Sequence, residues 1–144
     1  MTETTSATRG DRLVCPAAET PASAVMTSPA MTVCPGDSVA HAWDLMYRQG
    51  IHHLVVVESG RAVGLVDDRT LSAAWPPGPR GPYQQTVEAV VRAGVHCVLP
   101  DAPVRVVAQI MLATHRDAAP VVSGSGTILG VVTATDLVAL LARS

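Results

Sequence analysis

The residues best suited to chemistry lie in the stretch "GVVTATDL", residues 130–137. Thr133 is followed three residues later by Asp136, which is the spacing of a capping box. In that motif a hydroxyl and a carboxylate accept hydrogen bonds from backbone N–H groups at the start of a helix. A helix start also offers free N–H groups and a partial positive charge to an anionic ligand. The pair therefore has two interpretations, a helix cap and a ligand site.

A second stretch, "GLVDDRTL" at residues 64–71, has the same apolar pattern with the two polar residues exchanged. Asp67 is as good an N-cap as a threonine, and Thr70 is tolerated inside the first turn, so both stretches should start a helix. Binding of an anion should not survive the exchange. Asp67 places a negative charge where the anion would approach, which opposes a helix-dipole attraction of about 0.3–1 kcal/mol.

These stretches end the two copies of an internal repeat. A constant shift of 65 residues pairs Val33 with Val98 and Val57 with Val122, and the shift becomes 66 beyond an added turn residue. Each copy predicts an extended piece, an amphipathic helix, two β-branched strands and a second helix. We expect an α/β (α+β) fold of two β-α-β-β-α units. Neither unit easily buries its own apolar surface, so they should pack pseudo-symmetrically through their sheets.

The repeat also sets the expected boundaries. Asp37 and Asp101 stand where the first helix of each copy should have its N-cap. Pro and Gly residues between the copies are typical of a linker, and the first residues lack any periodicity. We expect a flexible N-terminal segment at 1–19, the first repeat at 20–75, a linker at 76–85 and the second repeat at 86–144.

Composition argues against several classes of protein. The chain has 144 residues, a net charge of −2, no lysine and no basic run, unlike proteins that bind nucleic acids. No apolar stretch approaches the roughly 20 residues that cross a bilayer, and the N-terminus lacks the order of a secretion signal. We expect a cytoplasmic protein with neither a membrane nor a nucleic-acid partner.

Catalytic and metal-binding motifs are missing from the sequence. It has no G-x-S-x-G, H-E-x-x-H or phosphate-binding loop, so we do not expect an enzyme. Cys15, Cys34 and Cys97 are odd in number and lack a C-x-x-C pair, which favours small buried hydrophobes or idle thiols over a disulfide or zinc knuckle. We expect no metal site, although histidines at 52, 53 and 115 with a cysteine have suitable ligand types.

The order of elements resembles a tandem pair of cystathionine-β-synthase (CBS) domains, called a Bateman module, over residues 20 to about 142. "VMTSPAMTVCPGDSVAHAWDLMYRQGIHHLVVVESGRAVGLVDDRTL" and "GVVTATDL" carry the resemblance. It implies regulation: such modules have clefts between two halves, often form homodimers, and in many cases bind adenine nucleotides or S-adenosylmethionine. It also implies that Thr133 faces a ligand phosphate and that Asp136 accepts from the ribose hydroxyls, which a carboxylate with two acceptor oxygens can do.

The resemblance points to further residues beside the ligand. His52 and His53 stand where some nucleotide-sensing members carry phosphate contacts, with exposed strand-entry residues as the alternative. The second copy has Asp117 and Ala118 there, and the preceding basic residues, His115 and Arg116, are expected to restore positive charge unless they form a solvated helix end. Three apolar residues are expected along the ligand, with plain core as the alternative for the valines: Val33, Val98 and Pro120.

We therefore expect a ligand sensor that binds AMP, ADP, ATP or S-adenosylmethionine in one cleft per chain. It should need no obligatory cofactor, form a homodimer and act on an unknown effector protein in trans. The cleft served by Asp67 and Thr70 should be empty, altered or specific for a less anionic ligand. The alternatives are a structural or interaction module without a ligand and, third, a metal or redox sensor.

Overall fold

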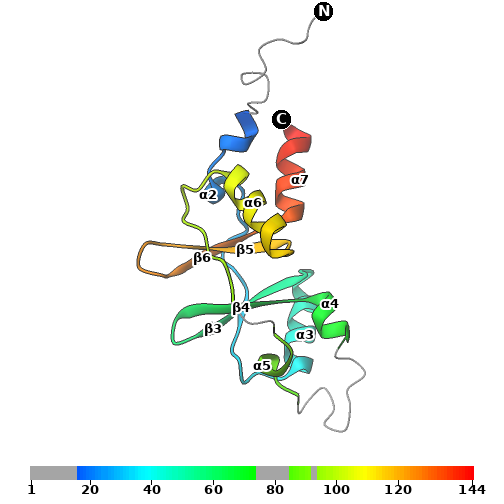
Figure 1. Ribbon diagram of the computed structural model, residues 1–144. Coiled ribbons are helices and arrows are strands. Elements are labelled where there is room, and N and C mark those ends of the chain that lie inside the picture. The colour runs from blue at the N-terminus through cyan, green and yellow to red at the C-terminus, as the bar shows by residue number, and fades with distance from the viewer. Residues whose placement is uncertain (1–15, 74–84, 92–93) are drawn as a thin grey trace, which may run out of the picture.

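Each copy of the repeat forms a small sheet with helices packed beside it (Figure 1). The computed structural model describes residues 16–73, 85–91 and 94–144. The first half contains β2 (Thr32–Val33), α3 (Val39–Gln49), β3 (His53–Glu58), β4 (Arg61–Asp67) and α4 (Asp68–Ala73). The second half contains α6 (Val104–Thr114), β5 (Ala118–Val122), β6 (Ile128–Thr133) and α7 (Ala134–Arg143). The predicted mixed α/β class with two similar units is confirmed.

The strands pair in the same way in both halves. β3 and β4 form an antiparallel hairpin, and β2 lies parallel to β3 at its other edge. β5 and β6 form the second hairpin, where an isolated parallel bridge between Val98 and Val121 replaces the first strand. The register shifts between Val56 and Val57 in one hairpin and between Val121 and Val122 in the other, which are equivalent positions. The two copies therefore share even the irregular position of the hairpin register.

The segment that leads into each repeat packs on the other repeat. Figure 1 shows α2 (Ala22–Val25) beside α6 and α7, and α5 (Val87–Val90) beside α3. Ala22 is fully buried in the core of the second half, and Val87 is fully buried in the core of the first. Each half is therefore completed by a segment that precedes the other half in sequence.

Backbone hydrogen bonds repeat this exchange at both helix starts. The N–H of Val104 donates to the carbonyl of Thr20, and the N–H of Val39 donates to that of Gln85, each at 2.8 Å. These four residues are pairwise equivalent under the shift of 65. Orphan N–H groups at a helix N-terminus need such partners. The exchanged segments supply them.

The two predicted N-caps are wrong. Ser38 caps α3, with its hydroxyl accepting from the N–H of His41 at 3.0 Å, while Asp37 accepts from the N–H of Cys34 in the preceding turn. Pro103 precedes α6 without a side-chain cap, so Asp101 does not have that role either. The backbone carbonyls of the exchanged segments reduce the need for side-chain caps.

The expected N-terminal segment and linker fall largely on residues outside the described part of the chain, namely 1–15 and 74–84. Residues 16–19 of the N-terminal segment form a 3-10 turn, η1 (Pro16–Glu19). Ala17 is buried there, and Glu19 pairs with Arg105 of α6 at 2.9 Å. This turn therefore belongs to the folded structure.

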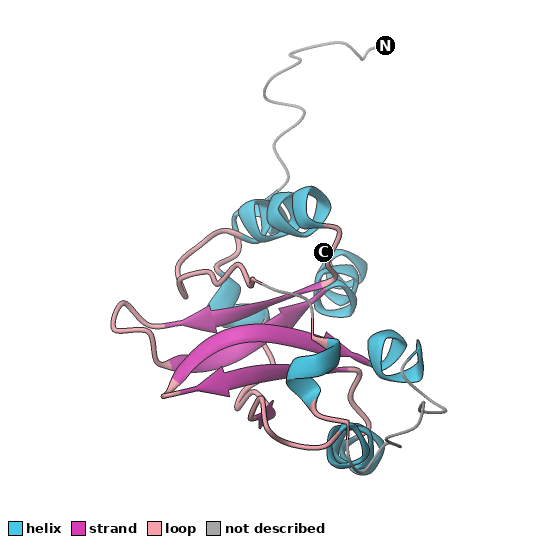
Figure 2. Ribbon diagram, turned by 60° about the horizontal axis from the view of Figure 1, so that its bottom comes forward, coloured by secondary structure: helices cyan, strands magenta, loops and turns pink. Residues whose placement is uncertain are grey.

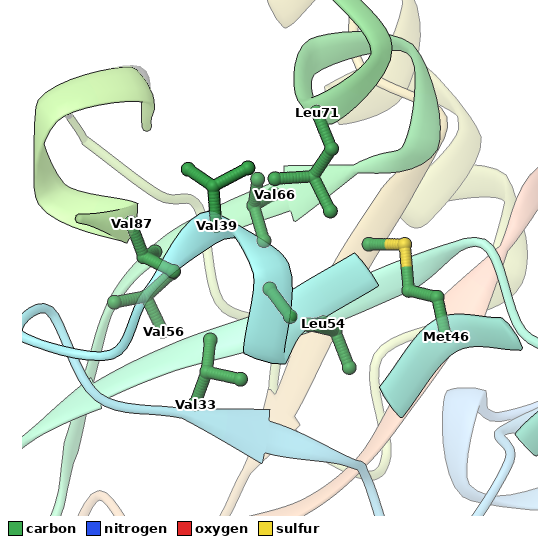
Figure 3. Close-up of a cluster of buried hydrophobic side chains, with 9 residues drawn as sticks. Val33, Val39, Met46, Leu54, Val56, Val66, Leu71 and Val87 are labelled. Atoms are coloured by element: carbon green, nitrogen blue, oxygen red, sulfur yellow. The ribbon is translucent and has the colours of Figure 1, made fainter. Parts of the chain in front are cut away.

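The core is built from valine, leucine, alanine and methionine. Figure 3 shows the cluster of the first half, where Leu54 and Val66 of the hairpin meet Val39 and Met46 of α3. A second cluster fills the other half, and a third joins the facing hairpins through Val55, Leu65, Ala118 and Val131. In Figure 2 the strands lie together with helices outside them. The expected packing through the sheets is confirmed.

Across the described residues, the helices are all too short or too polar to span a membrane.

Candidate functional site

Two clefts related by the repeat lie between the halves. We call the first the Thr133 cleft, and six of the residues that line it are Ala30, Met31, His52, His53, Val131 and Thr133. We call the second the Arg116 cleft, and six of its lining residues are Leu65, Val95, His96, Ile110, Arg116 and Ala118. Their cavity volumes are about 200 and about 180 Å³. The clefts therefore differ in chemistry more than in size.

Thr133 and Asp136 form a complete capping box at the start of α7. The Thr133 hydroxyl accepts from the N–H of Asp136 at 3.2 Å, and Asp136 Oδ2 accepts from the N–H of Thr133 at 2.8 Å. A threonine hydroxyl that accepts a hydrogen bond still has its own proton to donate. No described residue donates to the second carboxylate oxygen, Oδ1. Thr133 lines the cleft and Asp136 does not, so the cap leaves a hydroxyl proton inside the cleft and a carboxylate oxygen beside it.

The predicted cap of the first copy is confirmed. Asp67 Oδ1 accepts from the N–H of Thr70 at 2.7 Å at the start of α4, and the Asp67 side chain is one-quarter exposed. The exchange of polar residues keeps the helix start, as expected. It also leaves a partly buried carboxylate at the position that Thr133 holds in the other copy.

The histidines of the first half reach the Thr133 cleft, although each is bonded to a carboxylate. His52 Nδ1 lies 3.0 Å from Asp68 Oδ2, and its side chain is 72% exposed. His53 Nε2 lies 2.9 Å from Asp117 Oδ1, and its side chain is only 14% exposed. The cleft thus combines histidines of the first half with Thr133 of the second.

The basic residues of the second copy lie elsewhere. Arg116 lines the other cleft and donates from Nη2 to the carbonyl of Gly94 at 3.2 Å. His115 ends α6 in the left-handed conformation, with φ of 55°, and lines a surface cavity between α6 and α7. Neither residue lines the Thr133 cleft. The candidate site residues are therefore divided between different cavities.

The apolar candidates are buried in the core. Val33 belongs to the cluster of the first half and Val98 to that of the second. Pro120 is also fully buried, and its carbonyl accepts from the N–H of Val98 at 2.9 Å. None of the three lines either cleft. The plain-core alternative describes both valines, and Ala30 and Met31 supply the apolar wall instead.

A backbone pair fixes one wall of the Thr133 cleft. Thr27 and Val131 exchange hydrogen bonds at 2.8 and 3.0 Å, which brings the segment before β2 against β6. A Cβ atom on Gly130 would lie 2.6 Å from the Thr27 carbonyl oxygen and 2.8 Å from the Met26 sulfur. The glycine of "GVVTATDL" is therefore required for this close approach.

A charged cluster that sequence analysis missed lies where the halves meet. Ligand atoms of His53, Asp67 and Asp117 lie within 4.8 Å of one another, and Arg69 Nη2 lies 3.4 Å from Asp117 Oδ2. Burial acts to raise the pKa of Asp117, but the hydrogen bond and charge of His53, with the charge of Arg69, outweigh it and hold that pKa below its usual range. One signal could have indicated part of this cluster: the register of the β3–β4 hairpin places His53 opposite Asp67.

Cys34 and Cys97 are exposed free thiols, so of the two expected roles the buried hydrophobe is wrong for both and the idle thiol is left. Both lie in loop segments next to the first extended piece of their repeat. Partial burial still raises the pKa of the Cys97 thiol, which favours the unreactive protonated form. Cys15 lies outside the described residues.

The repeat, the paired sheets and the clefts between the halves define a module built from two tandem copies of one domain. Residues 22–76 and 87–143 match the CBS domain, and the chain belongs to the CBS domain family with two copies. An uncharacterized protein of Methanocaldococcus jannaschii, MJ1404, is 30% identical over 127 residues, covering 86% of this chain. The match covers only 28% of that relative, so the chain spans a minor part of its length.

Solved structures show the same fold. The CBS domain pair of protein MJ0100, in complex with 5′-methylthioadenosine and S-adenosyl-L-methionine, has a TM-score of 0.77 and 24% identity, covering 86% of this chain and 97% of that one. CBSX2 in complex with AMP has a TM-score of 0.70 and 21% identity, covering 85% and 96% of the two chains. The chain thus has the CBS-pair fold.

Proposed function

We propose that the Thr133 cleft binds an adenosine-containing nucleotide and that its occupancy is passed to a partner protein. One observation carries the proposal: the cleft joins the start of α7 and Thr133, from one half, to His52 and His53, from the other. The ligands named for the two similar structures, AMP and S-adenosyl-L-methionine with 5′-methylthioadenosine, support the adenosine class.

Residues in and next to the cleft suit the parts of such a ligand. Thr133 lines the cleft, and Asp136 follows the lining residue Thr135 without lining the cleft itself. A phosphate would accept a hydrogen bond from the Thr133 hydroxyl and lie at the positive end of α7, with the imidazole groups of His52 and His53 nearby. The ribose hydroxyls would donate to Asp136 Oδ1, the carboxylate oxygen left over by the cap. Ala30 and Met31 offer an apolar wall for the adenine.

Regulation would follow because residues of both halves line the cleft. Because a ligand in it contacts both halves, its affinity depends on their arrangement, and it favours the arrangement that it binds better. Occupancy of the cleft would act on a separate partner protein, and the chain would form a homodimer. Large apolar side chains are exposed on three helices and could bury themselves in a protein interface: Tyr47, Leu112, Val138 and Leu141.

A structural or interaction module without a ligand is the second candidate. It is favoured by the fact that the polar groups of the cleft already have partners within the chain. Thr133 and Asp136 cap α7, and His52 and His53 each meet a carboxylate. In this view the charged groups hold the two halves together and bind no nucleotide.

Thermal unfolding with AMP, ADP, ATP and S-adenosylmethionine separates the two candidates. A ligand present at a hundred times its dissociation constant adds about 2.7 kcal/mol to the free energy of unfolding, which raises the Tm by several degrees for a domain of this size. We expect at least one of the four to do so. No shift with any of them would leave the interaction module as the function.

A further inference from the structure

We propose that His53, Asp67 and Asp117 bind a divalent first-row transition-metal ion at the junction of the two halves. The three side chains come from both halves, and their ligand atoms lie within 4.8 Å of one another. The proposal does not rest on nucleotide binding. His53 lines the Thr133 cleft as well, whereas Asp67 and Asp117 do not line it.

The repeat explains why this place is acidic. Asp67 occupies the position that Thr133 holds in the other copy, and Asp117 occupies the position equivalent to His52. Two residues that suit an anion at the Thr133 cleft are therefore replaced by two carboxylates in the related place. The exchange that opposes a phosphate there favours a cation.

The geometry is held by the sheet. His53 and Asp67 are register partners on β3 and β4, and Asp117 immediately precedes β5. Their side chains are 14%, 25% and 45% exposed, so the site is half-enclosed and not a group of free surface chains. Ligand atoms on one zinc ion at about 2.0–2.2 Å can be at most about 4.4 Å apart, so small side-chain rotations would suffice.

Arg69 provides a second observation that a positive charge is stabilised here. Its Nη2 atom lies 3.4 Å from Asp117 Oδ2 and 3.8 Å from Asp67 Oδ2, between the two carboxylates. The Arg69 side chain is 77% exposed, so it can leave the carboxylates at little cost. Arg69 therefore competes with the metal ion, and its removal should strengthen metal binding.

The ligand set selects the class of ion. One imidazole nitrogen and two carboxylates suit Mn²⁺, Fe²⁺, Co²⁺ or Zn²⁺, whereas Mg²⁺ and Ca²⁺ prefer oxygen ligands alone. Three protein ligands leave coordination positions for water. Mn²⁺ is the better probe than Zn²⁺, because the exposed thiols of Cys34 and Cys97 would bind zinc but have little affinity for manganese.

The test is isothermal titration calorimetry of the full chain with MnCl₂ at neutral pH and without nucleotide. We expect one site per chain, at least tenfold weaker binding in Asp117→Asn and His53→Gln, and about two- to fivefold tighter binding in Arg69→Ala. His52→Ala is the matched control, since the exposed His52–Asp68 pair lies outside the cluster, and it should bind like the wild type.

Circular dichroism confirms that each variant is folded, and Arg69→Ala keeps all three ligands if a ligand variant unfolds. Absence of Mn²⁺ binding in both the wild type and Arg69→Ala would overturn the proposal and leave the cluster as an ion-pair network. Equal losses in His52→Ala and His53→Gln would overturn it as well, because the ion would then lie elsewhere.

Discussion

Asp136 combines a structural and a proposed ligand role, and substitution can separate them. Its Oδ2 atom accepts from the N–H of Thr133 at 2.8 Å, and Oδ1 is left for the ribose. Asp136→Ala removes both acceptors. Loss of the cap should lower the free energy of unfolding by about 1 kcal/mol. Loss of a charged hydrogen-bond partner of the ribose should cost about 1.5–3 kcal/mol of binding, which weakens AMP about 10- to 150-fold.

Asp136→Asn is the more informative change. The amide oxygen of asparagine can still accept from the N–H of Thr133, so stability should fall by no more than a few tenths of a kcal/mol. The charge is lost, so the affinity for nucleotide should still fall about tenfold or more. Urea unfolding measures the first quantity and calorimetric titration with AMP the second.

Thr70→Ala is the matched control in the other copy. Thr70 contributes its backbone N–H to the Asp67 cap, which alanine keeps, so both stability and AMP affinity should stay near the wild-type values. If Asp136→Asn bound AMP as tightly as the wild type while Asp136→Ala lost only stability, the cap would be the whole role of Asp136. The ligand assignment would then be refuted.

Three further predictions concern the fold and its charges. Gly130→Ala should cost about 1–3 kcal/mol in urea unfolding, because its Cβ would lie 2.6 Å from the Thr27 carbonyl oxygen, whereas Gly124→Ala, with nothing within 4 Å, should be nearly neutral; equal effects would contradict the close approach. Leu54→Ala, in the core, should cost about 2–5 kcal/mol, against at most about 0.5 for the 78% exposed Leu112→Ala. The lowered pKa of Asp117 means that its stabilising contribution is present above the unfolded pKa of about 3.9 and is lost as pH falls through the folded value. The urea midpoint of the wild type should therefore fall more steeply in that acid range than that of Asp117→Asn, by a small amount because Asp117 is 45% exposed, and parallel curves would refute the coupling.

The repeat was sufficient to predict the fold and both helix starts after the hairpins. Residues of the same type at a constant shift indicate equivalent positions in two similar units. The caps of Asp67 and Thr133 are local, since each side chain accepts from an N–H three residues later. The exchange of α2 and α5 between the halves could not be predicted in this way. It depends on which half each leading segment packs against, and both halves offer similar apolar surfaces.

The same limit explains the two wrong helix caps and an unpredicted contact of a candidate site residue. Asp37 and Asp101 have the right spacing for caps, but carbonyls of distant segments, from Thr20 and Gln85, take part of that role. His53 was expected beside a phosphate, and the structure also pairs it with Asp117, a residue 64 positions away. Contacts of this kind depend on the packing of one half against the other, which local patterns do not record.

The number of nucleotides bound per chain tests the central claim most directly. Calorimetric titration of the wild type with the nucleotide that gives the largest thermal shift should show one site per chain, and Asp136→Ala should weaken it strongly. The Arg116 cleft should contribute no second site, because the helix start of that copy has Asp67 at the position of Thr133. Two equivalent sites, or one site that survives Asp136→Ala, would contradict the assignment of the nucleotide to the Thr133 cleft.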